Sequence, residues 1–178
     1  MNRRYISLTM IVVMVGLVFA GQEAVAKVII GTDGDDTLVG TDTDDRLKGR
    51  GGDDRLKGSR GDDHLDGRDG DDRLKGSRGD DEIEGGVDND RLYGSRGDDK
   101  IVGSGDNDTI IPGEGDDKVY AGSGDDRIYA RDTESVDYID CGEGFDIVET
   151  IHSDDKTKRN CERTPGPERS DGEGQLTP

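Results

Sequence analysis

The sequence has few of the residues that build an ordinary hydrophobic core. Its 178 residues include no Trp and only two Phe, and hydrophobic side chains make up 28% of the whole. Part of that fraction lies in the first 26 residues, so the rest of the chain is poorer still in side chains that pack a globular interior. An interaction other than apolar burial must therefore hold any folded state together.

Positive charge is also scarce. Lys and Arg number 24 against 43 Asp and Glu, which gives a formal net charge of -19. Self-repulsion of this size opposes a compact state, and high charge with low hydrophobicity is typical of disordered chains. Binding to nucleic acid requires a basic face that this balance does not supply. We therefore expect cations, and no nucleic acid, as partners.

The one long apolar run lies at the N-terminus. Arg3 and Arg4 precede the apolar segment Ile11–Phe19, and residues 24–26 (Ala-Val-Ala) have the small-x-small pattern of a cleavage site. This arrangement predicts a secretory signal peptide over residues 1–26 and hence a secreted, extracellular protein. The alternative is an uncleaved membrane anchor, but the run is short for a bilayer. After cleavage, no segment is apolar enough to span a membrane.

Cysteine occurs twice, at Cys141 and Cys161. An even number of cysteines in an exported protein favours a disulfide, which here would close a C-terminal loop. The alternative is a pair of free thiols. We expect a structural bridge and no redox role.

A nine-residue repeat rich in Gly and Asp fills most of the chain. From Gly31 the sequence divides into eleven contiguous units that end at Tyr129. Position six is always Asp, position eight is Leu, Ile or Val, position five is Asp or Asn, and positions one and four are mostly Gly. Such a period indicates stacked structural units. The position-six residues are Asp36, Asp45, Asp54, Asp63, Asp72, Asp81, Asp90, Asp99, Asp108, Asp117 and Asp126.

The order of residues within a unit predicts a six-residue turn followed by a three-residue strand. The strand would place one apolar side chain inward between two outward ones. Glycine gives the turn the positive φ and the close backbone approach that tight loops need. Such turns point carbonyl oxygens inward and add one carboxylate each, which is the oxygen ligand set that Ca²⁺ prefers. The position-six aspartates are therefore predicted to bind several calcium ions.

Other metal sites fit less well. Mg²⁺ requires stricter octahedral geometry, and Zn²⁺ requires His or Cys, of which the repeats hold one His and no Cys. No segment has the twelve-residue spacing and closing Glu of an EF-hand loop.

The repeat resembles the G-G-x-G-x-D-x-U-x nonapeptide of the RTX, or haemolysin-type, calcium-binding family. This resemblance implies an all-β fold, a parallel β-roll, which is a right-handed β-solenoid with two repeats per coil. It further implies that calcium lies between turns two units apart on the same edge, held by the position-six aspartates and by backbone carbonyls.

Several positions depart from the family pattern. Position two is usually Ser, Thr or Arg instead of Gly. Pro112 and Ala121 replace Gly at position one, which indicates that this position does not require positive φ. Thr43, Asp88 and Asp106 replace Gly at position four. Because Asp adopts left-handed geometry more readily than Thr, we expect the turn with Thr43 to form the weakest site.

The ends of the chain differ from the repeats. Val28–Ile30 resembles the strand of an earlier repeat and is expected to cap the first coil. After Tyr129 the register shifts by two residues, and Asp137 and Asp146 keep position six in two degenerate units. The expected organisation is a signal peptide (1–26), a calcium-binding roll with its capping strand (27–129), a C-terminal cap of degenerate repeats (130–151) and a polar, disordered tail tied by Cys161 (152–178).

The sequence predicts a calcium-binding protein without enzymatic activity that is disordered until calcium binds. The alternative is a calcium-dependent adhesion or matrix-binding module. Arg55, Arg73 and Arg91 would stack beside Lys57 and Lys75 if alternate units align, and would then contact an anionic glycan or a cell surface. The same cations could instead simply offset nearby aspartates. A hydrolase is disfavoured, since enzymes place one acid–base pair in one cleft and these carboxylates recur in every unit.

Overall fold

The computed structural model describes residues 25–131, 135–150, 155–158 and 160–165. Nearly all of the predicted signal peptide, and residues 166–178 of the predicted tail, lie outside this part of the chain. The described residues form sixteen β-strands and no helix. Consequently, no helix in the described part is long and apolar enough to cross a membrane.

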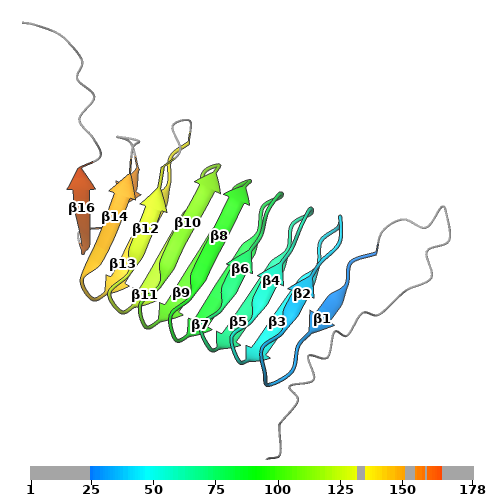
Figure 1. Cartoon of the computed structure of the whole chain (residues 1–178). Coiled ribbons are helices and arrows are strands. Elements are labelled where there is room, and N and C mark those ends of the chain that lie inside the picture. Colours follow the sequence, from blue (N-terminus) through cyan, green and yellow to red (C-terminus); the bar gives the residue numbers. More distant parts are fainter. Residues whose placement is uncertain (1–24, 132–134, 151–154, 159, 166–178) are drawn as a thin grey trace, which may run out of the picture.

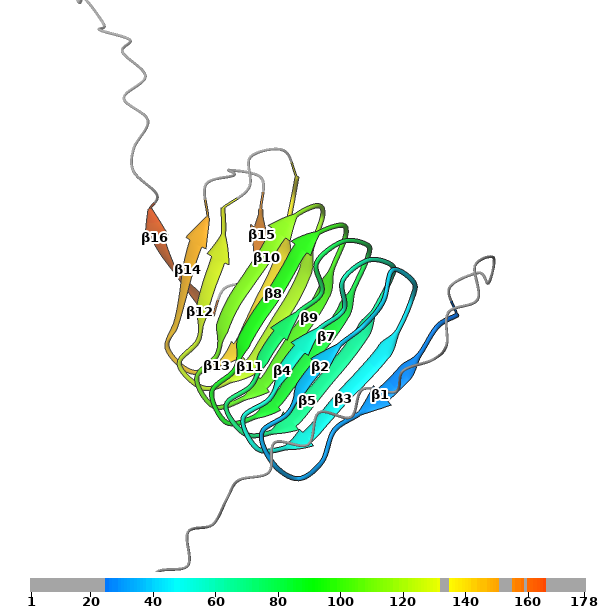
Figure 2. The same cartoon turned by 45° about the vertical axis from the view of Figure 1, so that its right-hand side comes forward.

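The strands form two parallel sheets that face each other (Figures 1 and 2). The odd-numbered sheet contains β1 (Val28–Ile30), β3 (Arg46–Gly51), β5 (His64–Asp69), β7 (Glu82–Val87), β9 (Lys100–Gly105), β11 (Lys118–Ser123), β13 (Tyr138–Glu143) and β15 (Lys156–Thr157). The even-numbered sheet contains β2 (Thr37–Val39), β4 (Arg55–Lys57), β6 (Arg73–Lys75), β8 (Arg91–Arg96), β10 (Thr109–Glu114), β12 (Arg127–Ala130), β14 (Asp146–Thr150) and β16 (Cys161–Pro165).

Successive units alternate between the sheets, so that two repeats complete one coil. Leu47 pairs with Leu65, and Leu65 pairs with Ile83, in parallel register. The predicted all-β fold, a parallel β-roll with two repeats per coil, is confirmed.

Most strands are longer than the three residues that the repeat pattern predicts. In β3 and β5 the pairing resumes after position one, where Arg50 pairs with Arg68 and Gly51 with Asp69. Equal coil lengths bring positions two and three of one coil beside the same positions of the next, so their backbones continue the ladder. The turn is thereby reduced to positions four to six.

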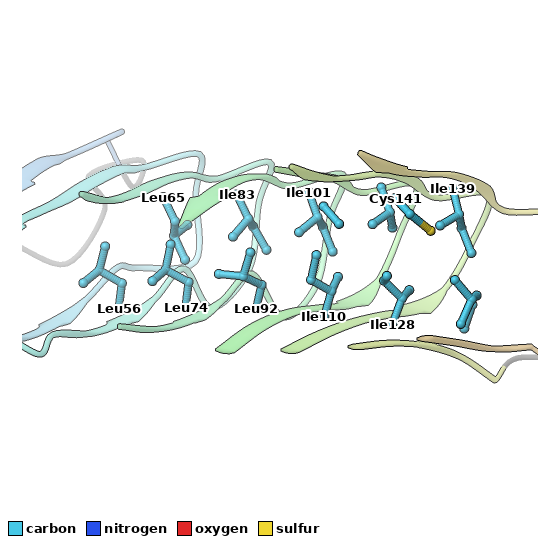
Figure 3. Close-up of a cluster of buried hydrophobic side chains, with 14 of the residues drawn as sticks. Leu56, Leu65, Leu74, Ile83, Leu92, Ile101, Ile110, Ile128, Ile139 and Cys141 are labelled. Atoms are coloured by element: carbon cyan, nitrogen blue, oxygen red, sulfur yellow. The ribbon is translucent and has the colours of Figure 1, made fainter. Parts of the chain in front are cut away.

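The core consists of one apolar side chain from position eight of each unit. The two sheets contribute facing rows of Leu, Ile and Val (Figure 3). From Leu47 to Val148 these side chains are at most 2% exposed, whereas Ile29 and Leu38 at the first coil are only partly buried. β1, which pairs only with β3, lies at the end of its sheet.

The C-terminal end extends further than the sequence indicates. The disulfide between Cys141 and Cys161 is present, with Cα atoms 5.5 Å apart, and it joins β13 of one sheet to β16 of the other. β15 and β16 lie inside the segment predicted to be a disordered tail from residue 152, and there the prediction is wrong. Asp155 continues the hydrogen bonding of the preceding coils and the disulfide fixes the last strand, so this segment joins the roll.

In six units, position two has positive φ although its residue is not glycine, whereas Thr32 and Thr41 at the same position do not. Arg50, Ser59, Arg68, Ser77, Ser95 and Ser104 have φ between 94° and 108°. Each such residue costs about 1–3 kcal/mol relative to relaxed backbone. At position four, Asp88 and Asp106 also have positive φ, whereas Thr43 does not. The departures from the family pattern at position two are therefore accommodated at an energetic cost.

Replacing a strained serine by glycine is expected to stabilise the roll. Ser104→Gly relieves positive φ in β9 and should raise the free energy of unfolding by about 1 kcal/mol. The matched control is Ser123→Gly. Ser123 is in β11, at position three of its repeat, and its φ is not positive, so the substitution should lower the free energy of unfolding by about 0.5–1 kcal/mol. Urea unfolding at saturating calcium measures both. Equal effects of the two substitutions would contradict the assignment of strain to position two.

Candidate metal centre

The position-six aspartates form two ladders, one along each edge of the roll. From Asp45 onward, each carboxylate accepts, through Oδ1, the backbone N–H of the position-six residue one coil earlier; for example, Asp54 N–H donates to Asp72 Oδ1 at 2.7 Å. The first edge carries Asp36, Asp54, Asp72, Asp90, Asp108, Asp126 and Asp146. The second edge carries Asp45, Asp63, Asp81, Asp99, Asp117, Asp137 and Asp155.

The structure thus places all eleven predicted aspartates in two equivalent rows. Asp137 and Asp146 extend these rows after the two-residue register shift, as the degenerate units indicated. Asp155 is a further member that sequence reasoning missed. Its sequence signals are the nine-residue spacing from Asp146 and the Asp-Lys-Thr order at positions six to eight, with Thr in place of the apolar residue.

The second carboxylate oxygen differs along the ladders: in the first two units it accepts hydrogen bonds from Thr32 to Asp36 and from Thr41 to Asp45. In nine later ladder aspartates, Oδ2 is inaccessible to solvent and makes no hydrogen bond: Asp54, Asp63, Asp72, Asp81, Asp90, Asp99, Asp108, Asp126 and Asp146. Burying an ionised oxygen without a partner costs several kcal/mol. A cation at these oxygens would remove that cost.

Backbone carbonyl oxygens lie near the same point. A Cβ atom placed on Gly49 would overlap both Asp54 Oδ2 and the carbonyl oxygen of Gly67 in the next coil. The same holds at Gly85, between Asp90 Oδ2 and the Gly103 carbonyl. Glycine avoids this overlap in these units, whereas the units that begin at Pro112 and Ala121 accommodate a Cβ at position one. None of the position-one glycines has positive φ, which confirms the expectation drawn from Pro112 and Ala121.

These oxygens define the kind of metal that fits. Among the described residues, no three His, Cys, Asp or Glu side chains converge on one point. A bound ion must therefore combine carboxylates with backbone carbonyls. Ca²⁺ accepts this mixed, flexible oxygen shell, whereas Zn²⁺ requires His or Cys.

The buried position strongly disfavours the ionised carboxylates. Burial raises the pKa of Asp72 to about 7 and the pKa of Asp90 to about 8. The N–H that Asp72 donates to Asp90 lowers the pKa of Asp90, but the neighbouring charges of Asp108 and Asp72 raise it again. Nearer the N-terminal end, burial raises the pKa of Asp54 to about 6. Without a bound cation, the buried aspartates of the ladders therefore favour the protonated form.

Position five forms a second, exposed ladder in the opposite direction. Asp53 N–H donates to Asp35 Oδ1, and Asp71 N–H donates to Asp53 Oδ1, both at 3.1 Å. Asn89 accepts in the same way through its amide oxygen, which explains why this position is always Asp or Asn. The sequence pattern contained this signal, but sequence reasoning assigned it no role.

Comparison with known families agrees with this geometry. A family model described as the RTX calcium-binding nonapeptide repeat (4 copies) matches residues 30–65, 48–83, 66–101, 84–119 and 102–132. These overlapping matches cover more than half of the chain. A comparison with curated proteins finds no match.

Acid is expected to promote folding in the absence of calcium. Because the folded roll raises the pKa of its buried aspartates, their protonation stabilises it fully below about pH 4, and this gain disappears as the pH rises through about 6 to 8. Far-UV circular dichroism of the calcium-free protein should show more β-structure at pH 5 than at pH 8. Added salt at pH 8, which only screens repulsion, should not reproduce the change. Less structure at pH 5 would contradict the prediction.

Proposed function

The chain belongs to the RTX calcium-binding nonapeptide repeat family, and we propose that it folds by binding calcium ions along its two aspartate ladders. The observation that carries this proposal is the row of buried Oδ2 atoms without hydrogen-bond partners. The proposed ligands are the position-six aspartates from Asp36 to Asp126, together with backbone carbonyls of the turns. Calcium, when bound, supplies the positive charge that these oxygens lack.

The remaining interactions favour a chain that does not fold without the ion. Each unit buries one apolar side chain, while position two is strained in six units by non-glycine residues at positive φ. The formal charge of -19 adds repulsion. Because the aspartates are brought together only when coils stack, ion binding and folding become one process.

We further propose that the protein is exported and acts by binding. The predicted signal peptide over residues 1–26 and the Cys141–Cys161 disulfide support an oxidising, extracellular environment. The same carboxylates recur from coil to coil along both edges, as stoichiometric ligands would. This repetition supports binding in preference to catalysis.

Calcium is expected to convert a disordered chain into a β-roll. Far-UV circular dichroism of the protein without residues 1–26 should change from a coil signal to a β signal during a calcium titration at pH 7.5, and EGTA should reverse the change. Magnesium at the same concentrations should give little β signal, because it keeps its waters and requires octahedral geometry. Full β-structure in EGTA, or no response to calcium, would overturn the proposed function.

Replacing a single ladder aspartate should distinguish its effect on calcium binding from its effect on folding without calcium. Asp90→Asn keeps the Oδ1 that accepts the Asp72 N–H but removes a charge beside Asp108. We expect the calcium concentration at the midpoint of folding to rise several-fold. At pH 8 without calcium, the variant should show more β-structure than the wild type. The control is Asp71→Asn in the exposed position-five ladder, which keeps its acceptor for Asn89 and should leave the midpoint unchanged. Isothermal titration calorimetry and circular dichroism measure the two effects, and equal midpoints for both variants would count against the ladder as the ligand.

A further inference from the structure

Positive charge is concentrated on the outer face of the even-numbered sheet. Arg55 pairs with Arg73 and Arg73 with Arg91, while Lys57 pairs with Lys75, so the alignment of alternate units is confirmed. β4, β6 and β8 lie side by side in this sheet (Figures 1 and 2). The turns after these strands and the end of β8 add a further column of cations: Arg60, Arg78 and Arg96.

Ion pairs occur on both faces of the roll, and some cations on each face remain outside them. On the odd-numbered sheet, acidic residues lie between the cations: Lys48 pairs with Asp66 at 3.1 Å, and Lys100 pairs with Glu82 at 2.7 Å. On the even-numbered sheet, among the residues that the structure describes, Lys57, Lys75 and Arg78 form no ion pair. These three cations are therefore not explained by neutralisation of nearby carboxylates.

Two of the position-seven arginines, Arg73 and Arg91, are less available. The guanidinium of Arg73 lies 4.9 Å from the centre of the Tyr93 ring. Arg91 acts on the edge of the roll, where its charge contributes to the lowered pKa of Asp71, after the hydrogen bonds from Asn89. The unpaired cations Lys57, Lys75 and Arg78 are thus at positions nine and three, next to the arginine stripe that the sequence suggested.

A shallow groove of about 700 Å³ lies between those two positions. Lys57 and Lys75 precede Ser59 and Ser77 in the chain, and Arg60 and Arg78 follow them, so a column of serines separates two columns of cations; all of these residues line the groove. Ser77 Oγ is buried and has no hydrogen-bond partner. Asp42 and Glu114, paired with Arg60 and Arg96, also line the groove and lie at its two ends.

We propose that this groove binds a linear anionic polysaccharide that lies along the axis of the roll. Cations repeat once per coil, about 4.8 Å apart, which is close to the length of one sugar in an extended chain. From Asp42 to Glu114 the groove crosses four coil steps, or roughly 19 Å, enough for about four sugars. Acidic residues at both ends limit the length of anionic chain that fits.

The lining residues favour a polysaccharide over other polyanions. The groove-lining residues include no aromatic side chain on which a nucleic acid base would stack, and no large apolar side chain that would enter a membrane. Serine hydroxyls suit the hydroxyl groups of sugars. The inference rests on the proposed function, since the groove exists only where coils have stacked.

The test uses heparin-derived oligosaccharides and oligogalacturonates as probes, titrated at saturating calcium by calorimetry. Affinity should rise from disaccharide to tetrasaccharide and then level off, and the preferred series distinguishes sulfate from carboxylate. The triple variant Lys57→Glu, Lys75→Glu, Arg78→Glu should bind at least ten-fold more weakly. The control Arg46→Glu, Lys118→Glu, Lys156→Glu places the same charge change on the odd-numbered sheet and should retain binding.

The outcomes separate the two proposals. An equal loss of oligosaccharide affinity in the two triple variants would overturn the polysaccharide groove. So would an affinity of the wild-type protein for single-stranded DNA or for phosphatidylserine vesicles equal to its affinity for the oligosaccharides. Circular dichroism in calcium is recorded for every variant, and Lys57→Gln, Lys75→Gln, Arg78→Gln repeats the comparison without added negative charge. If the wild-type protein folds in calcium but binds neither series of oligosaccharides, only the proposal of a polysaccharide groove is overturned. If calcium does not fold the chain, the proposed function is overturned.

Discussion

The burial of a carboxylate in successive repeats, with one oxygen unsatisfied in nine of them, is the constraint on which the rest of this structure depends. From Asp45 onward, each position-six aspartate contributes one hydrogen bond between coils through Oδ1 and leaves Oδ2 facing the backbone of its own turn. The hydrogen bond favours stacking, while burial and the neighbouring carboxylates oppose ionisation. Stacking and cation binding are therefore coupled at every coil, and this coupling takes the role that a large apolar core has in a globular domain.

Coupling of this kind acts between neighbouring coils, so the coil at each end of the roll, which has a neighbour on one side only, must be stabilised in another way. At the first coil, β1 is the terminal strand of the odd-numbered sheet, and Ile29 and Leu38 remain partly exposed. At the C-terminal end, Cys141 in β13 is fully buried, and its disulfide to Cys161 in β16 connects the two sheets. The covalent link thus ties β16, in the last described coil, to the coil before it, which explains why both cysteines lie at this end.

Much of the fold and of the candidate site could be predicted from the sequence, because both depend on a short repeat whose every position has one physical role. The position-eight row and the position-six aspartates follow directly from that repeat. What could not be predicted depends on contacts between coils: the longer strands, the role of position five, and the reason for Gly at position one. β15 was missed although Asp155 follows Asp146 by nine residues, because Thr157 replaces the apolar residue at position eight. β16 was missed because Cys161, which pairs with Asp146, follows Asp155 by only six residues.

The chain also contains a longer period that determines its two faces. Neighbours in a sheet are 18 residues apart, so outward residues stack according to alternate units. Ser-Arg occurs at positions two and three of the units that begin at Gly58, Gly76 and Gly94, all of which belong to the even-numbered side. The intervening units place mixed charges on the other sheet. A strongly acidic chain therefore presents a basic surface along β4, β6 and β8, because most of its aspartates lie in the edge turns.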